Sequence, residues 1–172
     1  MRNIELKCRC SDLGAARTRA ERLGARDAGF LHQRDVFFPA PDGRLKLRDF
    51  GDGTGELIAY RRADSEAAVG SDYVLFRTDE AAVLEAVLRH ALGQRGSVTK
   101  RRQLYLFRNT RIHLDEVEGL GTFVELETVI TGQTEAEAHA ELEEVAAALE
   151  LQAEDRVAQA YVDLMPPEGR AV

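Results

Sequence analysis

Two glutamates one residue apart, Glu125 and Glu127, form a pair whose spacing suggests chemistry. In a strand, residues i and i+2 point to the same side, so both carboxylates would face one space. Together with Glu5 and Asp115 from other strands, they would supply hard oxygen ligands for Mg²⁺ or Mn²⁺. The sequence therefore predicts a carboxylate metal site with one of these ions as cofactor.

Basic side chains recur on the same alternating faces as these acids. The strand RLKLR shows this most clearly, with its three bases on one face and two leucines on the other. The basic set is Lys7, Arg9, Arg44, Lys46, Arg48, Arg61, Lys100, Arg102 and Arg111. Nine bases against the four acids give +5, in a chain whose formal net charge is −7. A divalent ion ringed by Arg and Lys is suited to binding phosphates, whose oxygens match the arginine fork.

These charged faces have two interpretations. Each strand alone could turn its charges to water, as half-buried antiparallel sheets usually do. If the sheet closes on itself, the same faces point inward and need water or a polyanion between them, because like charges about 4 Å apart repel by roughly 4 kcal/mol at an effective dielectric of 20. The concentration of arginine favours the second interpretation.

The elements that would carry these residues can be read from periodicity. Strands are expected over 2–10, 32–38, 44–49, 56–62, 71–77, 98–107, 110–116 and 122–130, and 63–71 as a mobile loop. Helices are expected from a cap at Ser11 or Asp12 to Leu23, from Asp79 to Leu92, from a capping box at Thr134 and Glu137 to Leu149, and over 157–164. Because many strands follow one another without a helix between them, the pattern indicates an antiparallel α+β fold.

Length and composition limit the class of protein. The 172 residues suit one domain, expected over 1–165, with 166–172 as a flexible tail. An acidic chain with no membrane-spanning apolar run and no signal peptide is expected to be cytoplasmic and to bind neither nucleic acid nor membrane. Cys8 and Cys10 are expected to pack as small hydrophobic residues, without a zinc site.

The motifs RNIELKCRC, QRDVFF, RLKLR, ELIAYRR, VTKRR and RIHLDEVEGLGTFVELE together resemble the CYTH superfamily, also called the triphosphate tunnel metalloenzymes. They run in order from residue 2 to about 127, and YVDLM at 161–165 is similar to the usual C-terminal helix. The resemblance implies an eight-stranded antiparallel barrel, the tunnel, with helices packed outside. The superfamily includes class IV adenylate cyclases, thiamine triphosphatases and inorganic triphosphatases. The stretch HLDEVEGLGTFVELE looks most like the cyclases.

The resemblance also implies roles for individual residues. Glu5, Asp115, Glu125 and Glu127 would hold the metal, and all nine bases would grip a triphosphate, with Arg61, Lys100 and Arg111 also catalytic. His113 is interpreted as part of the wall, and Asp35 either positions a wall arginine or touches metal. The chain departs from the family motif E-x-E-x-K at Asn3, where the first glutamate is expected.

Three functions follow from this resemblance. The preferred function is hydrolysis of inorganic tripolyphosphate or an organic triphosphate. The alternatives are a class IV adenylate cyclase, which makes cyclic AMP and pyrophosphate from ATP, and a non-catalytic nucleotide or polyphosphate sensor. A small-molecule triphosphate is the expected partner, and a homodimer is left open.

Overall fold

A computed structural model describes residues 1–166, so the expected tail at 166–172 falls almost wholly outside the described residues. The strands are β1 Arg2–Arg9, β2 Arg26–Phe38, β3 Arg44–Asp49, β4 Gly55–Arg62, β5 Val69–Thr78, β6 Gly96–Phe107, β7 Thr110–Val117 and β8 Gly121–Val129. The helices are α1 Leu13–Leu23, α2 Ala81–Leu92, α3 Glu135–Ala148 and α4 Tyr161–Leu164, with a 3₁₀ turn at Ala153–Asp155.

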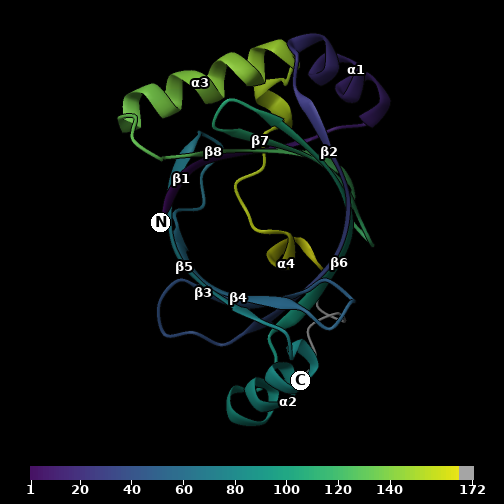
Figure 1. Ribbon diagram of the computed structural model, residues 1–172, viewed down its shortest axis with the longest axis vertical. Helices are drawn as coiled ribbons and strands as arrows, with labels where there is room; N and C mark the ends of the chain where they lie inside the picture. The colour runs from purple at the N-terminus through teal and green to yellow at the C-terminus, as the bar shows by residue number, and fades with distance from the viewer. Residues whose placement is uncertain (167–172) are drawn as a thin grey trace.

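The eight strands close into a barrel in the order β1-β5-β4-β3-β2-β6-β7-β8, visible as a ring in Figure 1. Closure occurs because β1 pairs with β5 on one side and with β8 on the other. Every neighbouring pair is antiparallel. The expected α+β class and the eight-stranded antiparallel barrel are therefore confirmed.

Helix boundaries follow the capping residues in the sequence. The Asp12 carboxylate accepts from the backbone N–H of Ala15, and Gly24 ends α1 with a left-handed φ of 87°. The predicted capping box of Thr134 and Glu137 is present at the start of α3. α2 differs from expectation, because its N-cap is Glu80 and not Asp79, without a side-chain capping bond.

Strand β2 begins six residues earlier than predicted. Its first part, RDAGF, contains polar residues and Gly29 with φ 92°, which conceal the alternation. A bulge lies between Asp27 and Phe30, and pairing with β6 holds the segment in the sheet. Tertiary pairing therefore overrides a weak local strand signal. β5 likewise begins at Val69, inside the stretch expected to be a loop.

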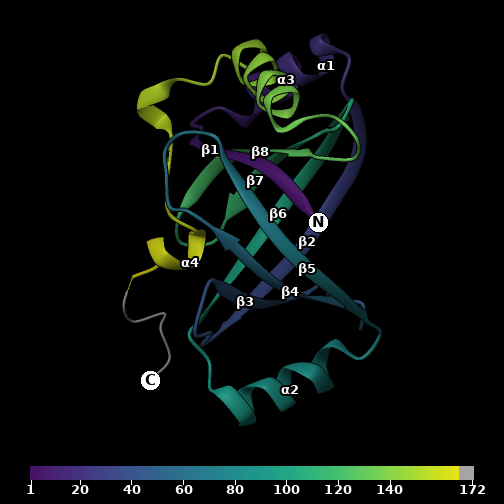
Figure 2. The same ribbon diagram turned by 90° about the vertical axis from the view of Figure 1, so that its left-hand side faces the viewer.

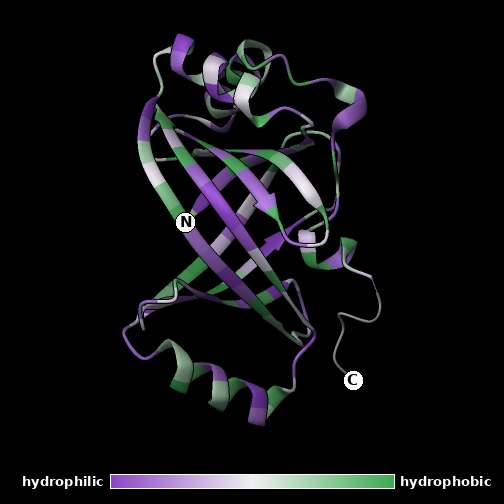
Figure 3. Ribbon diagram, turned by 90° about the vertical axis from the view of Figure 1, so that its right-hand side faces the viewer, coloured by the Kyte–Doolittle hydropathy of each residue, from purple (hydrophilic) through white to green (hydrophobic). Residues whose placement is uncertain are grey.

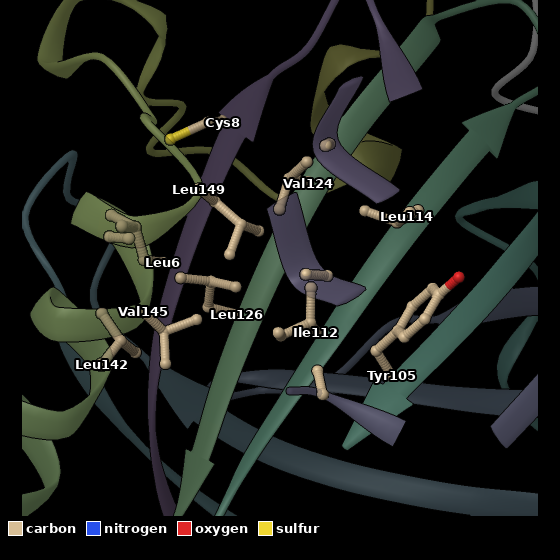
Figure 4. Close-up of a cluster of buried hydrophobic side chains, with 14 of the residues drawn as sticks. Leu6, Cys8, Tyr105, Ile112, Leu114, Val124, Leu126, Leu142, Val145 and Leu149 are labelled. Atoms are coloured by element: carbon tan, nitrogen blue, oxygen red, sulfur yellow. The ribbon is translucent and has the colours of Figure 1, made fainter. Parts of the chain in front are cut away.

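The hydrophobic core lies outside the ring. α1 and α3 pack on the outer faces of β1, β7 and β8, where Leu6, Leu126 and Leu142 are buried (Figure 4). α2 packs on β2 and β3 over a smaller cluster of Val36, Phe38 and Leu47. Because the apolar faces turn outward to the helices, the charged faces turn inward, and Figure 3 shows hydrophilic and hydrophobic residues mixed along the strands.

The cysteines follow the expectation from sequence. Cys8 is buried within this outer core, Cys10 packs against it, and both are free thiols. Burial raises the pKa of the Cys8 thiol to about 11, so it stays protonated at neutral pH.

Helix α4 lies at one end of the ring. Seen along the barrel it projects over the opening (Figure 1), and the turned view places it at the side away from the N-terminus (Figure 2). Tyr161 and Val162 join Phe37, Val98 and Phe123 in an apolar cluster that covers this end. Among residues 1–166, no helix is long and apolar enough to cross a membrane.

Candidate active site

A cavity of about 500 Å³ occupies the inside of the ring. It is bounded by Ala160 and Tyr161 at the α4 end and also reaches Met1 and Tyr73, and the N-terminus lies away from α4 (Figure 2). Its charged lining comprises the bases Lys7, Lys46, Arg48, Arg62, Arg77, Lys100 and Arg111 and the acids Glu5, Asp35, Glu56, Glu125 and Glu127. Seven bases against five acids give the lining a formal charge of +2.

The structure brings most of the predicted site residues to this cavity. Eight of them line it: Glu5, Lys7, Lys46, Arg48, Lys100, Arg111, Glu125 and Glu127. Five others do not: Arg9, Arg44, Arg61, Arg102 and Asp115. Three structural reasons account for these five residues.

The structure corrects the prediction that Arg61 of β4 belongs to the site. Its side chain is 72% exposed and pairs with Asp42 at 2.8 Å, outside the ring. Tyr60 and Arg62 face the cavity instead, and Arg62 Nη1 donates to Glu5 Oε2 at 3.2 Å. In the run YRR either arginine fits a basic residue at a strand end, but Arg62 shares the parity of Tyr60, and the pairing with β3 and β5 turns that face inward.

Arg9 and Arg44 lie at strand ends, beyond the cavity. Arg9 is the last residue of β1 and its guanidinium lies 5.2 Å from the ring centre of Phe123. Arg44, the first residue of β3, pairs with Asp64 at 2.8 Å and with Asp163 at 2.9 Å. Both residues have the inward parity that the sequence predicted, but they lie beyond the end of the cavity and do not line it.

Arg102 and Asp115 form a buried pair within the wall. Arg102 Nε and Nη2 each donate to the Asp115 carboxylate at 2.6 Å, and the Tyr161 hydroxyl donates to it at 2.9 Å. Both Asp115 oxygens are therefore occupied, which argues against the predicted role of Asp115 as a metal ligand. Arg102 also donates to Glu125 at 2.6 Å and so links this pair to the cavity lining.

Asp35 on β2 contacts three cations from the neighbouring strands β3 and β6. Its carboxylate accepts from Lys46 at 2.9 Å, from Arg48 at 2.8 Å and from Lys100 at 3.3 Å. Burial opposes ionisation of Asp35, but Arg48, Lys100 and Lys46 outweigh it and hold its pKa well below the usual range. Of the two interpretations made from sequence, the contacts favour Asp35 as the residue that positions these bases.

Lys100 carries the most informative shift among the bases. Burial, followed by the charge of Arg102, lowers its pKa to about 7. Burial likewise lowers the pKa of Lys46, followed by the charge of Arg48. This wall is therefore short of negative charge, which a bound polyanion would supply.

Three carboxylates face one another across β1 and β8. Glu5 is the register partner of Glu127, and Glu125 follows on the same face of β8. Burial raises the pKa of Glu5, and repulsion from Glu127 and Glu125 raises it further. Burial opposes ionisation of Glu125 as well, but the charge of Lys7, with His113 and Arg102 close by, holds its pKa well below the usual range.

His113 adds a nitrogen donor beside these acids. Ligand atoms of His113, Glu125 and Glu127 all lie within 4.8 Å of one another. His113 Nδ1 is buried without a hydrogen-bond partner. Mutual repulsion among the acids and this orphaned nitrogen both fit a bound cation, so the residues present suit a divalent metal.

Several lining residues were not identified from sequence. Arg62, Arg77, Glu56 and Tyr161 all reach the cavity, and Tyr161 comes from the C-terminal segment and not from the barrel. The alternation Glu56, Ile58, Tyr60, Arg62 in β4 was the available signal for two of them. Asn3 also lines the cavity, and its buried Oδ1 has no hydrogen-bond partner.

A closed antiparallel barrel whose charged interior faces a cavity defines a tunnel protein. The CYTH domain family matches residues 1–161, and the chain belongs to this family. No curated protein matches the sequence.

Solved structures agree with this fold. PH1012 from Pyrococcus horikoshii OT3 is 26% identical with a TM-score of 0.84, covering 95% of this chain and 99% of that one. A putative adenylate cyclase from Vibrio parahaemolyticus is 18% identical with a TM-score of 0.77, covering 94% and 96%. A putative adenylyl cyclase from Hippeastrum, described as having a dominant triphosphatase activity, is 16% identical with a TM-score of 0.67, covering 98% and 100%.

Proposed function

We propose that this protein is a divalent-metal-dependent triphosphatase that hydrolyses inorganic tripolyphosphate or an organic triphosphate inside the barrel. One observation carries the proposal. A wall of three bases, Lys46, Arg48 and Lys100, and a wall containing Glu125 and Glu127 line the same cavity. A phosphate chain needs the first wall and its metal ion needs the second.

Charge balance supports a triphosphate as the ligand. The chain of an organic triphosphate carries about four negative charges near neutral pH, one on each inner phosphate and close to two on the terminal one, and inorganic tripolyphosphate, with two terminal groups, carries about four to five. The lining charge of +2 and one divalent ion together give +4, which would neutralise such a chain. A monophosphate would leave the cavity with an excess of positive charge.

The residues present can be assigned roles in hydrolysis. Glu127 and Glu125, with Glu5 close by, would hold Mg²⁺ or Mn²⁺, which when bound supplies a polarised water and neutralises phosphoryl charge. Lys46, Arg48 and Lys100 would orient the chain, and Asp35 positions these three bases for it. Arg111, Lys7 and Arg62 line the same cavity and would stabilise the charge that develops on the terminal phosphoryl group.

A class IV adenylate cyclase is the second candidate, and the uncharged part of the lining favours it. Ile58, Tyr60, Tyr73 and Leu75 also face the cavity. Such side chains suit a nucleoside, which inorganic tripolyphosphate lacks. In this reaction the ribose 3′-hydroxyl attacks the α-phosphate and pyrophosphate leaves. The same walls would serve both reactions, because the position of the chain decides which phosphorus meets the nucleophile.

A ³¹P NMR time course distinguishes the candidates. The purified protein is incubated with tripolyphosphate or with ATP, each with Mg²⁺ or Mn²⁺. Orthophosphate is the expected product, and cyclic AMP with pyrophosphate, formed from ATP alone, would indicate the cyclase. Binding without turnover under all conditions would leave the sensor.

Matched variants test whether any turnover belongs to this cavity. Glu127→Gln removes a cavity carboxylate and is expected to abolish the activity. Glu116→Gln is the control, because Glu116 lies on the outer face of β7 beside Arg101. Equal activity in both variants would contradict the proposed site.

A further inference from the structure

A histidine and two glutamates on neighbouring strands converge at the cavity wall. His113 is the register partner of Glu125 across β7 and β8. Its Nδ1 lies 3.5 Å from Glu125 Oε2, and its Nε2 lies 3.9 Å from Glu127 Oε2. Two ligand atoms that share an octahedral ion at about 2.1 Å are about 3 Å apart when adjacent and about 4 Å when opposite. An imidazole binds one ion through one nitrogen, and a set of one ligand atom from each of the three residues lies within 4.8 Å. This set is less than about 1 Å wider than such a ligand shell.

The burial of His113 provides an independent observation. Its side chain is only 5% exposed, and Nδ1 makes no hydrogen bond. Buried polar atoms are nearly always bonded, and leaving one unbonded costs about 1–3 kcal/mol. Nδ1 faces the Glu125 carboxylate, so a cation between them would satisfy the nitrogen and reduce the repulsion between Glu125 and Glu127.

The glutamates differ in how firmly the protein already holds them. Glu125 accepts a hydrogen bond of 2.6 Å from Arg102, whereas the nearest base to Glu127 is Arg111 at 3.7 Å. Glu127 is therefore the carboxylate less firmly held by bases, and His113 Nε2 lies beside it at 3.9 Å.

We propose that His113 is a metal ligand together with Glu127 and Glu125, and that this nitrogen makes the site prefer Mn²⁺ and Co²⁺ to Mg²⁺. Imidazole suits transition ions, whereas Mg²⁺ keeps to oxygen ligands and water. The inference rests on the proposed function for the use of the metal, but binding of the metal alone can be measured without turnover.

Pulsed electron paramagnetic resonance of Mn²⁺ bound to the whole protein, without substrate, tests the ligand directly. Wild-type protein is expected to show coupling from a directly bound nitrogen, and its pattern should change when the histidines carry ¹⁵N. This isotope comparison needs no variant, so it does not depend on a mutant that folds. Absence of bound Mn²⁺, or bound Mn²⁺ without nitrogen coupling, would overturn the proposal.

A variant pair assigns the nitrogen to His113. His113→Gln is expected to lose the coupling and roughly tenfold or more in Co²⁺ affinity by calorimetry, since even residues that only support a ligand are worth about 10- to 100-fold. His90→Gln on the exposed face of α2 should keep both. Coupling that survives in His113→Gln would overturn the assignment. Nitrogen coupling without triphosphate hydrolysis would leave this inference intact and reject the proposed function.

Discussion

At the scale of single residues, two adjacent arginines on β4 show that neighbours in the sequence can have different surroundings and different roles. Arg61 and Arg62 are chemically identical, yet one side chain is 72% exposed and the other 6%. Arg62 reaches Glu5 and also donates to the backbone carbonyl of Ala158 in the C-terminal segment. The inward arginine therefore contacts both the proposed metal side and the segment that covers one end of the tunnel.

This pair gives a matched test of the tunnel. Arg62→Gln is expected to weaken tripolyphosphate binding roughly tenfold or more, since hydrogen bonds to charged groups are worth about 1.5–3 kcal/mol. Arg61→Gln should change the affinity less than about twofold, because this exposed side chain pairs with Asp42 and does not line the cavity. Isothermal titration calorimetry in the presence of Mg²⁺ measures both. Equal losses in the two variants would contradict the assignment of faces.

The lowered pKa of Lys100 predicts how the binding of tripolyphosphate depends on pH. With a pKa lowered to about 7, its amine is largely neutral at pH 8 in the free protein. A phosphate chain favours the charged form, so binding at pH 8 should take up about one proton, and affinity should fall as pH rises above 7. Calorimetry in two buffers of different ionisation enthalpy measures this uptake.

Two variants isolate the lysine in that experiment. Lys100→Gln should bind more weakly and lose the proton uptake. Arg111→Gln is the control, because it also removes a charge from the cavity lining but leaves Arg102 and Arg48, which lower the pKa of Lys100, in place, and an arginine does not titrate in this range. It should bind more weakly and keep the uptake. An uptake unchanged in Lys100→Gln would assign the proton to another group.

At the scale of elements, the C-terminal segment completes a site that the barrel leaves open. The backbone of Val157 donates to Lys7, and the side chain of Lys7 donates to the carbonyl of Gln159 at 3.2 Å. Tyr161 then places its ring 4.1 Å from the Lys7 ammonium and 4.9 Å from the ring of Phe123. A helix of only four residues is thus held by its contacts and not by its own helical hydrogen bonds.

The hydroxyl of Tyr161 is the polar part of this attachment. Tyr161→Phe keeps the ring but removes the bond to the buried Asp115 carboxylate. We expect the free energy of unfolding to fall by about 1.5–3 kcal/mol, as measured by urea denaturation. Tyr73→Phe, at a half-buried ring of the cavity lining, is the control and should stay within about 0.5 kcal/mol of wild type. Similar stabilities for wild type and Tyr161→Phe would show that packing alone holds α4.

At the scale of the whole molecule, charge is divided between the cavity and the rest of the chain. The total is −7 and the cavity lining is +2, so the other side chains sum to −9. A polyanion is therefore repelled by the net charge of the other side chains and attracted by that of the tunnel lining. The excess of buried positive charge also destabilises the empty barrel, and a bound polyanion would remove that cost.

Ligand binding should therefore stabilise the fold measurably. Tripolyphosphate with Mg²⁺ at 100 times its dissociation constant is expected to add about 2.7 kcal/mol. For a chain of this length that corresponds to an increase in Tm of about 5–11 °C by calorimetry. Sulfate at the same ionic strength is the control and should give a much smaller shift. An unchanged Tm with tripolyphosphate would indicate that the tunnel does not bind it.

The sequence by itself determined the wall of the barrel. Alternation of apolar and charged residues along strands such as RLKLR and FVELE gives each strand one apolar and one charged face. The capping residues Asp12, Gly24 and Thr134 fix where helices begin or end. These signals are local, since each depends on residues within a few positions of one another. For the same reason most of the inward bases and the glutamate pair could be predicted.

Only the tertiary structure decided which charges meet. Register between strands pairs Asp115 with Arg102 and sets His113 against Glu125. Alternation cannot supply this information, because it gives the face of a side chain but not its level along the barrel or its partner across it. Tyr161 reaches the cavity from a segment far away in sequence, and long-range contacts of that kind leave no local pattern to detect.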